Sequence, residues 1–277
     1  MAEIFEYNFM RKAFIVGILL AVIIPCIGII VVLKRLSMIG DALSHTSLAG
    51  VAAGLIIGIN PILGSIIACT LAALGIEAIR KKIPKYAEMS IAIVMSTGVG
   101  LAGILSGFVK NTANFDSFLF GSIVAISDFE TMLVIIISCI VILTFVLLYK
   151  ELFYIALDEQ SARLAGIPVK TINFIFTILT AITVSIAART VGALIVSSMM
   201  VVPVACAMQL GKSYKQTVIY SIIFAVFSML TGLYAAYYAG LKPGGTIVLT
   251  GVMCLIVIIC IRAVISRIRV KLTKHNI

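Results

Sequence analysis

An aspartate and a histidine lie four residues apart inside an apolar segment of the chain. Asp41 and His45 belong to the run Met38–Gly54, which otherwise contains mostly apolar and small residues. In a helix, side chains four positions apart project from one face, about a turn apart. A carboxylate and an imidazole placed in this way can ligate one divalent transition metal together. The pair is therefore a candidate ion site.

The spacing of this pair also fits a second interpretation, an Asp–His ion pair that holds a helix near the membrane interface. Spacing alone favours neither interpretation. Zinc prefers four ligands, so Asp41 and His45 are too few for a stable site. An ion in a permeation pathway must leave again, and a site with few protein ligands suits that purpose. Water, backbone carbonyls or a symmetry mate would supply the remaining ligands.

The other reactive residue types form no catalytic pattern. The second histidine, His275, lies in a basic C-terminal segment, and no phosphate-binding glycine loop or serine–histidine–acid set is present. The cysteines stand singly inside apolar runs, which predicts neither disulfides nor thiolate metal sites. We expect no catalysis in this chain and no tightly bound cofactor. The six cysteines are Cys26, Cys69, Cys139, Cys206, Cys254 and Cys260.

The elements that must position Asp41 and His45 are membrane-spanning helices. Of the 277 residues, 62% are hydrophobic and only 12% are charged, far fewer than a water-exposed domain carries. Apolar runs near the ~20 residues that a bilayer requires predict an all-α membrane protein with eight or nine spans. No polar stretch is long enough for a separate soluble domain, so we expect one transmembrane domain over 1–277. The runs cover 13–33, 37–59, 61–79, 89–108, 129–149, 172–188, 190–208, 217–239 and 246–265.

The basic residues orient these spans. The net charge of +10 comes from short clusters between apolar runs, which is typical of cytoplasmic loops and does not indicate nucleic-acid binding. With nine spans and the N-terminus outside, the clusters at 34–35, 80–85, 150–170, 212–215 and 262–274 all lie on the cytoplasmic side. If the stretch 36–79 crossed only once, the N-terminus would change sides. In both arrangements residues 150–171 and the basic tail 266–277 are cytoplasmic.

The longest internal segment that does not span the membrane is 150–171. Acidic residues at its centre and the sequence Gly166-Ile167-Pro168 at its end are the start and stop signals of a short helix. We predict a helix over 157–166. A short amphipathic helix on the cytoplasmic side would dock a partner protein.

Four motifs together resemble the permease family of zinc, manganese and iron-chelate ABC importers, over residues 9–265. They are SMIGDALSHTSLAGVAAG (37–54), LFGSI (119–123), DEQSARLAGIP (158–168) and VGALIVSSMMVVPVACA (191–207). The first contains the family's Gly-Asp-Ala-Leu-Ser-His type of signature. It is slightly more similar to zinc permeases than to manganese permeases.

The resemblance implies a cobalamin-importer-like (type II) ABC permease fold in a bacterial plasma membrane. It implies a second permease copy, two cytoplasmic ATP-binding subunits and an extracytoplasmic metal-binding protein, with ATP hydrolysed outside this chain. The transported ion would be Zn²⁺ first and Mn²⁺ second, coordinated by Asp41 and His45. The family's ATPase-coupling positions correspond to Asp158, Glu159, Ala162 and Gly166.

Two other functions fit the residues. A proton-coupled secondary metal transporter would use Asp41 and His45 as a relay, and would need neither ATP nor a docking helix. A membrane anchor or assembly subunit would tolerate replacement of both residues.

Overall fold

The computed structural model describes residues 8–83, 86–109 and 126–275, with the side chains of 194 and 265–275 left out. Within these ranges there is no β-strand, so the predicted all-α class is confirmed. The LFGSI motif at 119–123 lies outside the described residues. The described helices are α1 (Asn8–Leu33), α2 (Ile39–Ile57), α3 (Pro61–Lys82), α4 (Ala87–Ser106), α6 (Asp128–Leu147), α7 (Tyr149–Leu157), α8 (Glu159–Leu164), α9 (Val169–Thr190), α10 (Ala193–Leu210), α11 (Tyr214–Ala239) and α12 (Pro243–His275).

Each of the nine predicted apolar segments corresponds to one of these helices. Eight are long and apolar enough to cross a membrane: α1, α2, α3, α4, α6, α9, α11 and the part of α12 up to Val264. The ninth, α10, is apolar but has a shorter continuous stretch, Ile195–Leu210. The expectation of eight or nine spans is therefore confirmed by length and composition.

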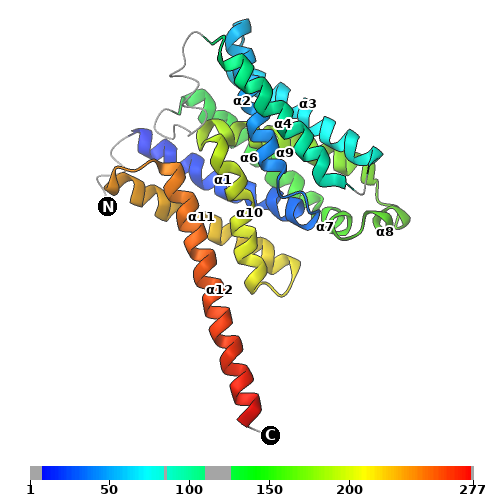
Figure 1. Ribbon diagram of the computed structural model, residues 1–277, viewed down its shortest axis with the longest axis vertical. Helices are drawn as coiled ribbons and strands as arrows, with labels where there is room; N and C mark the ends of the chain where they lie inside the picture. The colour runs from blue at the N-terminus through cyan, green and yellow to red at the C-terminus, as the bar shows by residue number, and fades with distance from the viewer. Residues whose placement is uncertain (1–7, 84–85, 110–125, 276–277) are drawn as a thin grey trace.

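Helix α1 lies at the centre of the bundle and packs against α6, α10 and α11 (Figure 1). Of the most apolar stretch of α1, 72% is buried inside the protein, whereas only 11% of the corresponding stretch of α12 is buried. The long α12 projects beyond the other helices in the same view. Because lipid is as apolar as a side chain, outward-facing surfaces of such helices need not be polar. Burial therefore distinguishes central helices from peripheral ones, and hydropathy does not.

Helices α2, α3 and α4 form a closely packed group. A Cβ atom added to Gly50 of α2 would lie 2.5 Å from the carbonyl oxygen of Gly64 in α3, so the two backbones meet without room for a side chain. Next to this contact, the hydroxyl of Ser65 is 2.7 Å from that of Ser47 and 2.6 Å from that of Ser185 in α9. Small residues permit such close approach of membrane helices. The contacts join α2, α3 and α9.

The predicted helix over 157–166 is wrong in its bounds. The chain forms two helices there, α7 ending at Leu157 and α8 running from Glu159 to Leu164. Asp158 separates them because its backbone is extended (φ −151°, ψ 108°) and its carboxylate accepts a hydrogen bond from the Gln160 N–H at 2.9 Å. This is the geometry of a helix N-cap. The predicted stop is confirmed, since Gly166 has a φ of +81° that side-chain-bearing residues avoid.

Candidate metal pathway and coupling segment

Asp41 and His45 both lie in α2, Asp41 in its first turn. Helix α2 is the second most buried span, with 67% of its apolar window inside the protein. Helices α3, α4, α9 and α10 pack against α2. Asp41 and His45 are half-buried, whereas the three residues between them are buried. The two ionisable side chains therefore lie together on the one strip of this part of α2 that the described chain leaves accessible.

Neither side chain has a charged partner within the described part of the chain. The ion pairs found there do not include Asp41 or His45, so the alternative of an internal Asp–His pair is not what the structure contains. No group of three or more His, Cys, Asp or Glu side chains able to hold a metal occurs among the described residues. One copy of α2 thus offers two candidate donors on an accessible strip.

Polar residues are buried behind this strip, and the sequence did not predict them. Ser44, between Asp41 and His45, is 1% exposed, and its hydroxyl has no hydrogen-bond partner. On the same side, Gly40 lies against Ser197 of α10, where an added Cβ would approach the Ser197 Cα atom to 3.2 Å. The only sequence signal for this packing is the run of small residues in 37–54. That run predicts close packing without naming the partner helix.

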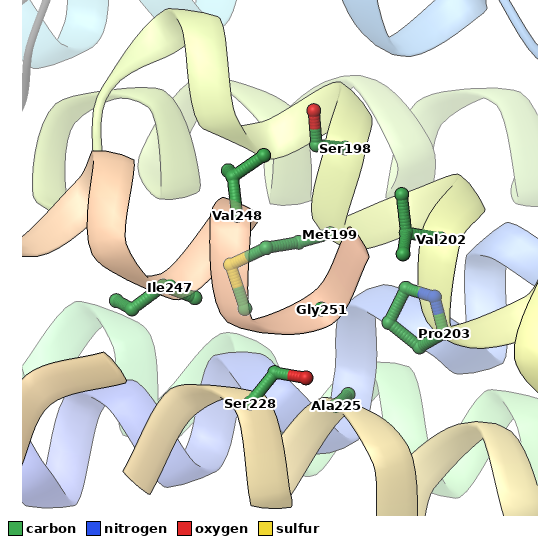
Figure 2. A pocket seen from close by; sticks show the side chains of 9 residues that line it. All are labelled: Ser198, Met199, Val202, Pro203, Ala225, Ser228, Ile247, Val248 and Gly251. Atoms are coloured by element: carbon green, nitrogen blue, oxygen red, sulfur yellow. The ribbon is translucent and has the colours of Figure 1, made fainter. Parts of the chain in front are cut away.

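Pro203, inside α10, borders a separate crevice between α10, α11 and α12 (Figure 2). The crevice contains apolar side chains and two serines, and none of its lining residues has a carboxylate or an imidazole. It is therefore no candidate for the ion site. Its lining consists of Ser198, Met199, Val202, Pro203, Ala225, Ser228, Ile247, Val248 and Gly251.

The four expected coupling positions lie in or beside α8. Ser161 donates a 2.5 Å hydrogen bond to Asp158, and this bond, with the one from the Gln160 N–H, holds the pKa of the Asp158 carboxyl below its usual value. Ala162 is 3% exposed and packs into an apolar cluster that includes Ile155 and Val169. These contacts attach α8 to α7 and α9. Gly166 ends the segment in a left-handed conformation.

Helix α8 and the C-terminal end of α7 present apolar side chains outward, Leu164 from α8 and Leu157 and Tyr154 from α7. Leu164 is 89% exposed, Leu157 is 62% exposed and Tyr154 is 59% exposed. Exposed charged residues of the same segment, Asp158 and Arg163, lie between them along the chain, so this surface is not uniformly apolar like that of a lipid-facing helix. An exposed apolar group with a polar rim is typical of a surface that binds another protein.

Comparison with known proteins decides the family. Residues 6–262 match the ABC 3 transport family. This chain belongs to that family. The resemblance inferred from the four motifs is thereby confirmed, and with the apolar helices it makes the chain a multi-pass protein of a bacterial plasma membrane.

Several curated relatives match along most of the chain. The protein of Treponema pallidum named "Probable metal transport system membrane protein" is 35% identical over 261 residues, covering 94% of this chain and 97% of its own. The manganese transport system membrane protein MntC of Listeria monocytogenes is 33% identical, covering 88% and 87%. The high-affinity zinc uptake system membrane protein ZnuB of Haemophilus influenzae is 26% identical, covering 88% and 94%.

A solved structure confirms the architecture. The structure of PsaBC from Streptococcus pneumoniae in complex with Fab contains a chain that superimposes with a TM-score of 0.82 at 27% identity. The match covers 93% of this chain and 94% of that one. The helical arrangement described above is therefore that of an ABC transporter permease.

Proposed function

We propose that this chain is the permease subunit of an ATP-driven importer of a divalent transition metal, and that Asp41 and His45 contact the ion as it crosses the membrane. Relatives named for metal, manganese and zinc transport support the cargo class. ATP is hydrolysed by two copies of a separate cytoplasmic subunit, and an extracytoplasmic binding protein delivers the ion. The permease holds no cofactor tightly, since the metal is its cargo.

The observation that carries this proposal is the accessible strip of α2 with two ionisable side chains and no charged partner in the described chain. A carboxylate in a membrane-spanning helix costs up to about 2.5–3.5 kcal/mol at the helix centre on insertion scales, and less towards a helix end, where Asp41 lies. Such a cost requires compensation, and a passing dication supplies it. An Asp–His ion pair would also supply it, but the side chains are not paired in the structure.

A second copy of the chain would complete the site. The strip that carries Asp41 and His45 is the part of α2 that the other described helices leave uncovered. If two such strips face each other across a pathway, they bring two carboxylates and two imidazoles together. Four ligands of these types suit zinc, and the mixture of nitrogen and oxygen also suits manganese.

We propose further that the entire chain, 1–277, acts as one transmembrane domain, with residues 150–171 and the tail 266–277 on the cytoplasmic side. Helix α8 and the end of α7 then meet the ATP-binding subunit through their exposed apolar residues, while Asp158, Glu159, Ala162 and Gly166 shape and attach α8. The choice between ions stays a prediction: Zn²⁺ first and Mn²⁺ second. Relatives named for each metal match the chain, so their names do not order the two.

Uptake into vesicles tests the proposal. The permease is reconstituted with its ATP-binding subunit and binding protein, and accumulation of radioactive zinc or manganese is measured beside ATP hydrolysis. In Asp41→Asn/His45→Gln we expect uptake to fall at least about tenfold, which corresponds to ~1.4 kcal/mol. ATP hydrolysis persists because α8 is unchanged. The matched control is Glu88→Gln, which removes an exposed carboxylate from the first turn of α4 and leaves uptake unchanged.

Competition in the same uptake assay tests whether the permease prefers zinc or manganese. Each unlabelled ion competes against the other's radioactive form, and stronger inhibition by zinc is the expected outcome. Undiminished uptake of both ions by the double variant would show that the pair is not in the pathway. Uptake without ATP would instead indicate a secondary transporter.

A further inference from the structure

A cluster of largely buried charges lies where α8 approaches the end of α3. Arg80 donates two hydrogen bonds to Glu77 of the same helix, from Nε to Oε2 at 3.1 Å and from Nη2 to Oε1 at 3.0 Å. Its Nη2 atom also lies 3.9 Å from Oε2 of Glu159, the first residue of α8. The side chains of Arg80 and Glu77 are only 17% and 14% exposed. One guanidinium is therefore hydrogen-bonded to the carboxylate of Glu77 and lies within ion-pair distance of a second carboxylate from a separate helix.

Lys34 extends this cluster to the junction between α1 and α2. Its Nζ atom donates a 2.6 Å hydrogen bond to Oδ1 of Asn173 in α9. Burial lowers the pKa of Lys34 to about 8; the Arg80 charge acts in the same direction, and Glu159 and Glu77 oppose it. Lys34, Asn173 and Arg80 also line one small cavity. That cavity is lined by Ile39 as well, the residue that begins α2.

The cluster bridges elements whose backbones do not pack closely. Helix α8 packs on α7 and α9, whereas α3 packs on α2, α4 and α9. The contact of Arg80 with Glu159 therefore reaches from α8 to α3 through side chains. Helix α3 is in turn fixed to α2 by the contact of Gly50 with Gly64. A continuous set of contacts thus runs from α8 through Arg80 and α3 to α2.

We propose that Arg80 is a positioning residue that couples α8 to the α2–α3 pair. Displacement of α8 by the ATP-binding subunit pulls on the end of α3 through Glu159 and Arg80. The bidentate contact with Glu77 keeps the guanidinium aligned with α3, since such paired contacts fix geometry as well as charge. Helix α2 then moves with α3. This inference rests on the proposed function, because it assigns α8 to the ATP-binding subunit.

Uptake per ATP hydrolysed tests the linkage in the reconstituted complex. We expect Arg80→Gln to lower this ratio at least about fivefold, the scale of a typical coupling energy between sites. The hydrolysis rate and the amount of assembled complex stay close to wild type. Arg80→Lys keeps the charge without the paired geometry, and restores part of the ratio. The matched control is Lys82→Gln, which removes an exposed charge from the same turn of α3 and leaves the ratio unchanged.

A double-mutant cycle distinguishes linkage from general damage. If Arg80 acts through Glu159, the variant Arg80→Gln/Glu159→Gln loses no more than the stronger single variant. Losses that multiply would show that the two residues act independently and would overturn the proposal. A parallel fall of hydrolysis, assembly and uptake in Arg80→Gln and Arg80→Lys would overturn it as well, because that is the pattern of a purely structural residue.

A second measurement does not depend on the cargo. Met38, one turn before Asp41, is 52% exposed. Met38→Cys is introduced where the exposed Cys139 and Cys260 are replaced by serine, and its labelling by a water-soluble maleimide is followed with and without ATP. We expect ATP to change the labelling of Met38→Cys when Arg80 is unchanged, and not when Arg80→Gln is also present. An equal ATP response in both would refute the linkage. If no metal is transported but labelling responds as expected, the proposed cargo fails and the linkage stands.

Discussion

The contact between Gly50 and Gly64 leads to a prediction whose size follows from the structure. In Gly50→Ala the new methyl group would lie 2.5 Å from the Gly64 carbonyl oxygen, 2.6 Å from the Cβ atom of Ala68 and 2.8 Å from the Cα atom of Ser65. Two of these three atoms belong to the backbone of α3, so no side-chain rotation relieves the overlap. Since ordinary contacts of this kind begin at 3.4 Å, α2 and α3 must separate by up to the difference, 0.9 Å.

Separating the two helices costs more free energy of folding than the replacement of glycine by alanine contributes. Overpacking typically destabilises a protein by about 1–3 kcal/mol, while replacing glycine by alanine in a helix contributes about 0.5–1 kcal/mol of stability. Moving α2 also stretches the 2.7 Å hydrogen bond between the buried Ser47 and Ser65 hydroxyls. We expect a net loss of about 1–2 kcal/mol, and each kcal/mol lowers Tm by ~2–4 °C in proteins near this size.

Thermal unfolding in detergent, followed by the reactivity of the buried cysteines, measures the effect. Gly75→Ala is the matched control, because Gly75 lies in α3 and an added Cβ there meets no atom within 4 Å. Its Tm should equal or slightly exceed that of the wild type. If Gly50→Ala were as stable as Gly75→Ala and retained full uptake, the close packing of α2 on α3 would be refuted. The linkage through α3 would then lose its second step.

Two further predictions concern charged groups at the helix ends. The folded-state pKa of Lys34, about 8, lies below its ordinary value of 10.5, so between these values the unfolded chain binds more protons than the folded chain and stability rises with pH. From pH 7.5 to 9 the gain in stability is about 1 kcal/mol. We expect a matching rise in Tm, which Lys34→Met largely removes. Glu130, at the start of α6, pairs with Arg189 at 2.9 Å and its side chain is 9% exposed. Glu130→Gln keeps the helix-capping contact with Ser127 but removes this pairing, and should lower stability by about 1–3 kcal/mol. The carboxylate of Asp128, which pairs with Lys12, is 92% exposed, so Asp128→Asn should leave stability almost unchanged. Equal losses of stability in Glu130→Gln and Asp128→Asn would show that burial of the Glu130 pair contributes nothing.

Local features of the chain determined the spans and the candidate pair. Long apolar runs predict helices because a backbone in lipid must satisfy its hydrogen bonds within one segment. The helical period alone places Asp41 and His45 on one face, whatever surrounds them. The end of the 150–171 helical segment at Gly166 was equally predictable, because a left-handed residue that stops a helix favours glycine. The break at Asp158 had a local signal too, an aspartate able to cap α8, but it was interpreted as part of a longer helix.

Tertiary structure decided which face of each helix meets which neighbour. The run of small residues in α2 predicts close packing, yet only the fold shows that Gly50 meets Gly64 and that the strip with Asp41 and His45 stays uncovered. Arg80 and Glu159 are far apart in sequence, as are Lys34 and Asn173. Arg80, Glu159 and Lys34 each look like an ordinary surface charge when considered alone, and Asn173 looks like an ordinary polar residue. Periodicity describes a helix by itself, whereas contacts between helices depend on how the whole bundle fills space, and no local pattern contains that information.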